Sequence, residues 1–155
     1  MTIDSEVDTL CRVPLFKGID AKKLRLLAFI SERTCFRSGE HLCSQGERGD
    51  SAFIILKGEA DVVVTTESGE QVVAQVGAND IVGEIAILCD VPRTASLVAV
   101  SDMDVLTISK ESFLKLLKEF PEMALEVMRA LAQRLEKTTR DLSTATAILA
   151  DQAAG

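Results

Sequence analysis

The chain has 155 residues with 24 acidic and 17 basic side chains, a formal net charge of −7 and 47% hydrophobic residues. This length suits one well-buried core, and the acidic balance argues against direct binding to nucleic acid, which needs a basic face. Because no apolar run approaches the roughly 18 residues that span a bilayer and the acidic stretch 1–8 does not fit a signal peptide, we expect a soluble, cytoplasmic protein that does not contact membranes.

The first predicted elements are helical. Residues 13–18 read as a turn and helical entry, and Asp20 can cap a helix over 21–30 whose apolar face includes Leu24, Leu27 and Ala28.

From Cys35 to Ile108 the sequence changes to short β-rich runs, and turn residues fill nearly every gap. Strands are predicted over 34–36, 41–44, 52–56, 61–66, 71–76, 80–82, 95–100 and 105–108. Many short strands with polar turns indicate an antiparallel roll rather than a parallel sheet that alternates with helices. The predicted fold is mainly β: a β-roll or jelly roll of about eight strands with N-terminal helices, a short helix after Gly83 and a long C-terminal helix.

Two helices are predicted after the strands. Ser109 caps a helix over 110–120, and Pro121 ends that helix and can open the last one, which runs to about Leu149. We assign residues 1–120 to the roll with its N-terminal helices. Residues 121–155 form a long lid or dimerisation helix of the same domain, and residues 121–149 alone would extend roughly 43 Å.

The last helix carries a heptad pattern. Residues at alternating spacings of three and four form a seam over three repeats, which predicts a parallel homodimer through this helix. The seam consists of Met128, Leu131, Leu135, Thr138, Leu142, Ala145 and Leu149. The alternative is that the first half of this stripe packs on its own roll.

The segment 82–97 places Glu84 and Arg93 nine residues apart within an otherwise apolar stretch. The planar fork of a guanidinium suits a phosphate, and the N–H groups of a short helix opening at Gly83 would add positive partial charge beside it. An ionised Glu84 only accepts hydrogen bonds and would repel a phosphate, so it suits a sugar hydroxyl. Together the two side chains predict a site for a ribose phosphate. The spacing leaves open the alternative that they form a surface ion pair.

The remaining chemistry-bearing residues favour no enzyme. Cys11, Cys35, Cys43 and Cys89 lack the C-x-x-C spacing of a metal or redox site, so we expect free thiols. The single histidine, His41, cannot supply the two or three imidazoles that a cupin-type metal oxygenase needs. We predict no catalytic residues, no metal site and no enzyme cofactor.

At this point the chain resembles the cyclic-nucleotide-binding domain family. The phosphate-binding cassette of that family runs Gly-Glu, a short apolar helix, a small loop, then Arg, a Ser, Thr or Ala, and Ala. The matching positions are Gly83, Glu84, 85–88, 89–92, Arg93, Thr94 and Ala95, and Gly46, Asp50, the run 52–56, Gly58 and the long helix also fall where the family has them.

The resemblance implies a cyclic-nucleotide-binding regulatory or sensor protein. It implies that Arg93 binds the cyclic phosphate and that Glu84 accepts from the ribose 2′-OH. The N-terminus of the short helix, with Gly83, Ile85 and Ala86, then donates to the phosphate.

The base site follows from a weaker part of the same resemblance. In the catabolite-activator branch of the family, two adjacent hydroxyl residues on the dimer helix reach the adenine, and residues 134–139 resemble that segment. This implies that Thr138 and Thr139 read the base, with Arg134 in support. Val62 and Val73 are candidate apolar walls for the base.

Base selectivity stays open because of Thr94. Members selective for cGMP use a Thr after the cassette Arg to bond guanine, whereas bacterial cAMP binders often place a hydroxyl there to bond the phosphate. We favour cAMP as the ligand. A cGMP-selective sensor and a nucleotide-independent scaffold are the alternatives.

The family often joins this domain to an output module such as a DNA-binding helix-turn-helix. The sequence ends at 150–155, where a catabolite-activator-like protein would continue into that module. We expect either a part of a longer protein or a stand-alone sensor that acts through its dimer or through an unidentified protein partner. In both cases ligand capture would shift the cassette, and the long helix would move with it.

Overall fold

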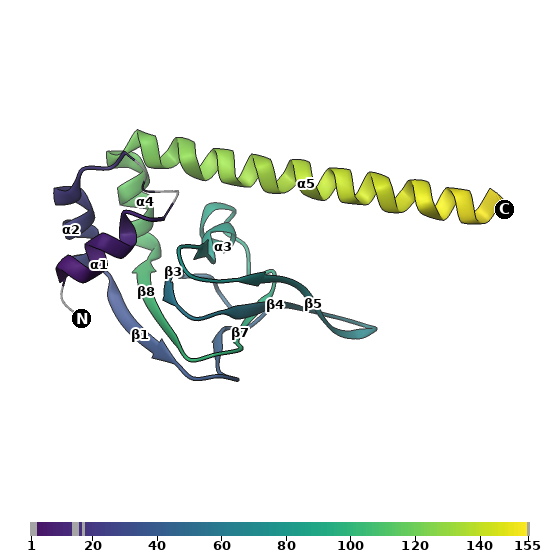
Figure 1. The fold of residues 1–155 in the computed structure, drawn as a ribbon, viewed down its shortest axis with the longest axis horizontal. Helices are drawn as coiled ribbons and strands as arrows, with labels where there is room; N and C mark the ends of the chain where they lie inside the picture. Colours follow the sequence, from purple (N-terminus) through teal and green to yellow (C-terminus); the bar gives the residue numbers. More distant parts are fainter. Residues whose placement is uncertain (1–2, 14–15, 17, 155) are drawn as a thin grey trace.

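A computed structural model describes residues 3–13, 16 and 18–154 of the chain. Two antiparallel four-stranded sheets form a roll, with strand orders β1-β8-β3-β6 and β2-β7-β4-β5 (Figure 1). The strands are β1 Glu32–Phe36, β2 His41–Cys43, β3 Ser51–Lys57, β4 Ala60–Thr66, β5 Gly69–Val76, β6 Ile81–Val82, β7 Ser96–Ala99 and β8 Met103–Ser109. The predicted roll of about eight strands is confirmed.

Five helices accompany the strands within the described residues. They are α1 Ile3–Leu10, α2 Ala21–Ile30, α3 Glu84–Leu88, α4 Lys110–Glu119 and α5 Pro121–Ala154. Helix α1 was not predicted, because a short segment with three acidic residues carries little periodic signal; its Val7 and Leu10 become buried only against the rest of the core. The predicted turn over 13–18 lies partly outside the described residues.

The two predicted helix caps are confirmed. The Asp20 side chain accepts a hydrogen bond from the Lys22 N–H at 3.1 Å, and the Ser109 hydroxyl accepts one from the Ser112 N–H at 3.2 Å. These side chains satisfy N–H groups that have no partner within the helix itself.

The buried core has two parts that meet at β3. Residues 52–56 are buried without alternation because helices cover one face of this strand and the second sheet covers the other. Ala52, Ile54 and Leu56 face the helical part, together with residues of α1, α2, α4 and the start of α5. Phe53 and Ile55 face the part between the sheets.

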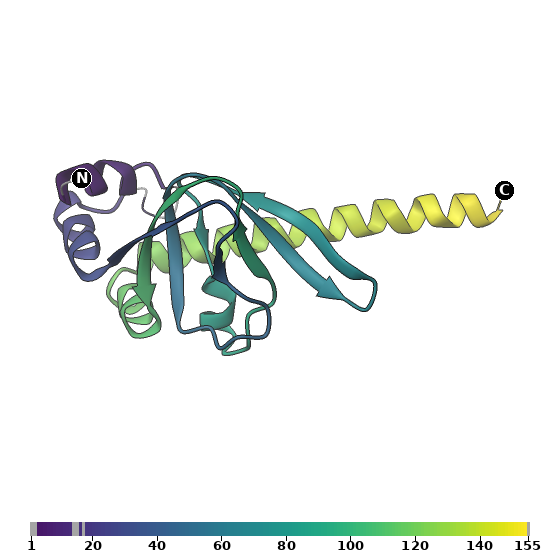
Figure 2. The same cartoon turned by 90° about the horizontal axis from the view of Figure 1, so that it is seen from below.

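Helix α5 divides into a packed and a projecting half. Met123 and Val127 are buried in the helical core, and Leu131 packs against it partly buried. Leu135, Leu142 and Leu149 are exposed. The C-terminal part of the helix extends past the roll (Figures 1 and 2). Of the seam residues, Leu131 therefore packs on the roll, whereas Met128 is 57% exposed and the three later leucines are exposed as well. None of the helices in the described part combines the length and apolar character needed to cross a membrane.

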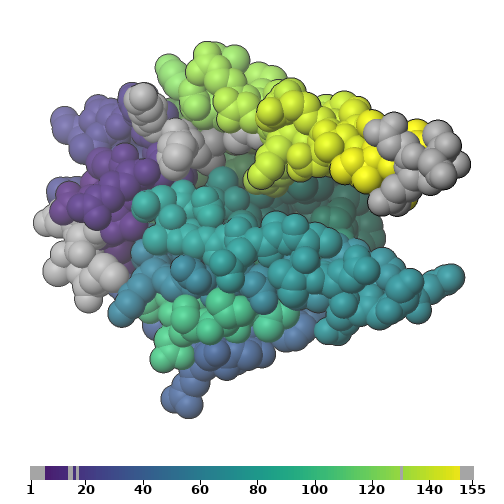
Figure 3. All heavy atoms as spheres, turned by 45° about the vertical axis from the view of Figure 1, so that its right-hand side comes forward, coloured from purple at the N-terminus to yellow at the C-terminus, as the bar shows by residue number. Residues whose placement is uncertain are grey.

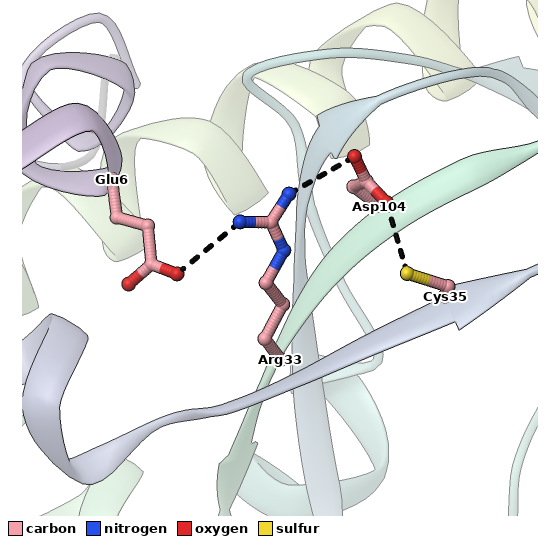
Figure 4. Close-up of polar contacts among 4 residues, drawn as sticks. All are labelled: Glu6, Arg33, Cys35 and Asp104. Carbon is pink, nitrogen blue, oxygen red and sulfur yellow. Dashed lines mark hydrogen bonds and ion pairs between the residues drawn. The ribbon is translucent and has the colours of Figure 1, made fainter. Parts of the chain in front are cut away.

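A chain of polar contacts ties α1 to the roll (Figure 4). Arg33 on β1 pairs with Glu6 of α1 at 3.6 Å and with Asp104 of β8 at 3.1 Å, and the Cys35 thiol donates to Asp104 at 3.1 Å. The hydrogen bond from Cys35, followed by the hydrogen bond and charge of Arg33, lowers the pKa of Asp104. The hydrogen bond to Asp104 and its negative charge raise the pKa of Cys35.

Candidate functional site

The cassette predicted from the sequence forms a strand, a turn and a short helix. Val82 ends β6, Gly83 takes a left-handed conformation with φ 85°, and α3 begins at Glu84. A Cβ on Gly83 would lie 2.6 Å from the Nη1 atom of Arg93. Glycine is needed here both for the positive φ and for the close approach of the arginine.

Arg93 lies in the interior, with 6% of its surface exposed. Its Nη1 donates to the Gly83 carbonyl at 3.0 Å and its Nη2 to the Ser51 carbonyl at 2.7 Å, while the guanidinium stands 5.4 Å from the centre of the Phe53 ring. These groups hold the side chain but carry no full negative charge. Among the described residues no carboxylate forms an ion pair with Arg93. The arginine is therefore a buried cation with donor capacity left for an anion.

Glu84 is also buried, with 4% of its surface exposed, and it pairs with a different cation. Arg134, a half-exposed residue of α5, approaches it with 3.1 Å between Nη1 and Oε1. The alternative of a surface ion pair between Glu84 and Arg93 is thus wrong. Instead, the pair joins the cassette to the long helix.

The loop that precedes β3 packs closely against helix α3 of the cassette at Gly49. Gly49 is buried, and a Cβ at this position would lie 2.2 Å from the Cβ of Ala86 on α3. No rotamer change can relieve a clash between two Cβ atoms, so the loop and α3 can approach this closely only with glycine at 49.

A cavity of about 810 Å³ lies between the roll and α5, where the molecule is visibly hollowed (Figure 3). This volume falls in the range of roughly 300–1,000 Å³ that small-molecule sites occupy. Eleven of the twelve predicted site residues line it, namely Val62, Val73, Gly83, Glu84, Ile85, Ala86, Arg93, Thr94, Ala95, Arg134 and Thr138. Segments far apart in the sequence therefore meet around one space.

Thr139 is the predicted residue that the cavity does not include. It lines a shallow groove on another side of α5, together with Leu135 and Arg140. Successive residues of a helix are rotated by about 100°, and this rotation turns Thr139 toward the groove while Thr138 faces the cavity.

Several cavity residues were missed by the sequence reasoning. Gln75 and Gln133 line the cavity from β5 and α5, and Cys43 lines it from β2. Burial raises the pKa of the Cys43 thiol, against the opposing effect of the Arg93 charge, so the thiol is neutral. Glutamines carry no pattern that marks them as site residues. The lone histidine, His41, lies exposed beside the Ser44 hydroxyl, outside the cavity.

A family model for the cyclic nucleotide-binding domain matches residues 33–120. The chain belongs to the cyclic nucleotide-binding domain family. The match covers the roll, the cassette and α4, which include every strand after the start of β1. The family predicted from the cassette residues is confirmed.

Individual relatives agree with this assignment. A cAMP-dependent protein kinase regulatory subunit of Mycosarcoma maydis is 37% identical over 110 residues, which cover 68% of this chain and 21% of the relative. A cGMP-dependent protein kinase of Drosophila melanogaster is 32% identical over 120 residues, covering 75% of this chain and 13% of that kinase.

The same fold is present in a solved bacterial structure. The crystal structure of the Thermus thermophilus catabolite activator protein matches with a TM-score of 0.79 and 28% identity, covering 86% of this chain and 63% of that chain. This chain thus spans about a fifth of the fungal subunit and under two thirds of the bacterial protein. The matched proteins differ in the nucleotide that their names specify, so the family alone leaves the base open.

Proposed function

We propose that this chain is a regulatory domain that binds cAMP in the cavity between the roll and α5. The observation that carries the proposal is the buried Arg93, which is held by carbonyl groups and has no carboxylate partner among the described residues. A cyclic phosphate would supply the single negative charge that this cation lacks. The domain's role would be to sense the nucleotide rather than to transform it.

The two buried charged residues of the cassette would each bind a different part of the ligand. Arg93 would bind the phosphate, together with N–H groups of the first turn of α3. Glu84 has one oxygen engaged by Arg134, and its remaining lone pairs would accept from the ribose 2′-OH. The Arg134 contact fixes the position of the carboxylate.

A hydroxyl on α5 supports adenine over guanine. The Thr138 hydroxyl donates to the Arg134 carbonyl at 2.8 Å, because a carbonyl can only accept. With its proton committed, the Thr138 oxygen can accept from the amino group at the 6-position of adenine. Guanine presents an acceptor oxygen at that position, which would need a donor instead. Thr94 also lines the cavity and is the residue that would favour cGMP.

The Glu84–Arg134 pair would couple the ligand to the long helix. It crosses from the cassette to α5, and Val127 and Leu131 of α5 line the same cavity while they pack in the helical core. A ligand that displaces or tightens this pair would change the position of α5 relative to the roll. Ligand capture would then be transmitted to whatever binds the projecting half of the helix.

A second copy of the chain is our proposed partner for that half. Leu135, Leu142 and Leu149 repeat every seven residues and are 65–69% exposed. A parallel pairing would bury them and would bring Thr139 of each helix toward the other copy. Sedimentation equilibrium tests this: the wild type should be a dimer and Leu142→Arg a monomer, whereas a monomeric wild type would contradict the pairing.

Thermal unfolding with added nucleotide tests the binding proposal. A ligand at 100 times its dissociation constant adds about 2.7 kcal/mol of stability, which shifts the midpoint by several degrees. We expect cAMP to raise the midpoint more than cGMP does, and 5′-AMP to leave it unchanged because its phosphate is not cyclised. If neither cyclic nucleotide acts, the chain is a nucleotide-independent scaffold. A larger effect of cGMP would identify the cGMP-selective alternative.

A further inference from the structure

Residues 93–95 leave the sheet just where they reach the cavity. Strand β4 pairs with β7 in a regular register that ends at Val63 opposite Ser96. Continuing that register by two residues would set Thr65 opposite Thr94. The chain instead bends away before β7 begins, and Thr94 lines the cavity. The backbone groups of Thr65 on this side therefore lose the strand that would have paired with them.

The side chain of Gln45 takes the place of that missing strand. Its Oε1 accepts from the Thr65 N–H at 2.7 Å, and its Nε2 donates to the Thr65 carbonyl at 3.2 Å. An amide side chain offers the same donor and acceptor as a peptide group, so it can pair with both backbone groups of one strand residue. The pairing also fixes which end of the amide is oxygen.

The backbone around Gln45 is part of the loop that holds Arg93. The Gln45 N–H donates to the Ser96 hydroxyl at 2.8 Å. The next residue, Gly46, donates to the Arg93 carbonyl at 2.9 Å, and the Arg93 N–H donates to the Glu47 carbonyl at 2.7 Å. One residue thus joins the segment that positions Arg93 to the outer part of the β4–β5 hairpin.

The hairpin needs such an attachment because of its place in the sheet. Strand β5 is the edge strand, all but its last residue are exposed, and the end of the hairpin projects beyond the rest of the roll (Figures 1 and 2). Val62 and Val73, the apolar walls at the base end of the cavity, both lie on this hairpin.

We propose that Gln45 is a positioning residue that fixes the distance between the two ends of the ligand site. Its side-chain amide pairs with the backbone of Thr65 in place of residues 93–95, which lie outside the sheet. This pairing holds the base-contacting hairpin against the loop that positions Arg93. The inference rests on the proposed function, because it assigns the base and the phosphate of a cyclic nucleotide to these two ends. Without the amide, the part of the hairpin beyond Val63 would lose its attachment to the Arg93 loop. The adjoining wall formed by Val62 and Val73 would then be held less firmly, while the phosphate kept its site.

The test combines a ligand-free and a ligand-dependent measurement on Gln45→Leu. Gln71→Leu is the matched control, since Gln71 is exposed on β5 of the same hairpin. In the free protein, hydrogen exchange at the Thr65 amide should accelerate at least about tenfold in Gln45→Leu, because its protecting partner is lost. The affinity for cAMP should fall about fivefold or more, the scale of one or two neutral hydrogen bonds. The affinity for 3′,5′-cyclic ribose phosphate, which has no base, should change less than about twofold.

Other results of these measurements would contradict the role proposed for Gln45. Unchanged exchange at Thr65 would overturn the proposal whatever the ligands do. Equal losses for cAMP and the base-free ligand would show that Gln45 acts only on the Arg93 loop, which also overturns it. If the wild type binds no cyclic nucleotide, the proposed function fails, and the exchange measurement still decides whether Gln45 holds the hairpin.

Discussion

The two ends of the cavity are built in opposite ways. At the end proposed for the phosphate, Arg93 and Glu84 are almost fully buried, and Arg93 donates to carbonyl groups at the start of β3 and just after β6. At the base end, Val73 is 58% exposed on an edge strand, and Thr138 stands on the exposed part of α5.

This difference indicates how strongly each end of the cavity can discriminate between ligands. A buried cation with fixed donors discriminates strongly, because a ligand without the matching charge leaves it uncompensated. Exposed apolar walls and a single hydroxyl discriminate weakly, because water can replace a missing contact. We therefore expect the cassette to determine that a cyclised phosphate binds, and the hairpin and α5 to determine which base is preferred.

The largest expected effect comes from removing the cation at the phosphate end. Arg93→Ala should lower cAMP affinity by about ten- to a hundredfold, since a charge-assisted hydrogen bond contributes roughly 1.5–3 kcal/mol. Arg93→Lys should recover only part of this loss, because it keeps the charge but not the planar fork. Calorimetric titration measures both. Arg129→Ala is the control: Arg129 also lines the cavity but pairs with Glu126 on α5. Equal affinities for wild type and Arg93→Ala would refute the phosphate assignment.

An intermediate effect is expected at the sugar. Glu84→Gln removes the charge that pairs with Arg134 and weakens the acceptor for the ribose 2′-OH, so cAMP affinity should fall about three- to tenfold. The ratio of affinities for cAMP and 2′-deoxy-cAMP should shrink toward one. Competition binding measures this ratio, with Glu126→Gln as the matched control on the cavity rim. A ratio that stays at its wild-type value would place the 2′-OH elsewhere.

A smaller effect is expected at the base end. Thr138→Val keeps the shape of the side chain but removes the hydroxyl oxygen, so the preference for cAMP over cGMP should drop by about two- to fivefold. The same competition assay reports the preference. Thr139→Val should act only if a second copy of the chain brings Thr139 to the site, since it faces a different groove within one chain. A preference unaffected by Thr138→Val would move base reading to Thr94.

No effect on nucleotide affinity is expected from the cluster that ties α1 to the roll. Asp104→Asn removes the carboxylate that raises the pKa of Cys35, so alkylation of Cys35 at pH 8 should accelerate relative to Cys11 while cAMP affinity stays unchanged. Mass spectrometry after iodoacetamide treatment measures the rates.

The same variant tests a pH dependence of stability. Because the folded pKa of Asp104 is lowered, its contribution to stability is present above the unfolded value of about 3.9 and is lost as the pH falls through the folded value. Acid unfolding of the wild type and Asp104→Asn should therefore converge at low pH. A constant difference between them down to low pH would contradict this assignment.

The phosphate end was predictable from the sequence because its residues lie within 16 consecutive positions. Gly83, Glu84 and Arg93 each need a specific residue type, for a positive φ, an acceptor and a forked cation. The caps at Asp20 and Ser109 were predictable for the same reason, since each satisfies N–H groups a few residues away.

The chain order of residues thus determined the roll, the cassette and the class of ligand, all of which depend on local pattern and turn chemistry. Only the tertiary structure decided that Glu84 pairs with Arg134, that Gln45 pairs with Thr65 and that Thr139 faces away from the cavity. These contacts join residues 20 to 50 positions apart, or depend on the rotation of one helix against the roll. The spacing of side chains along the sequence predicts neither these long-range contacts nor the rotation of the helix, because both depend on how the helix and the hairpin pack against the roll.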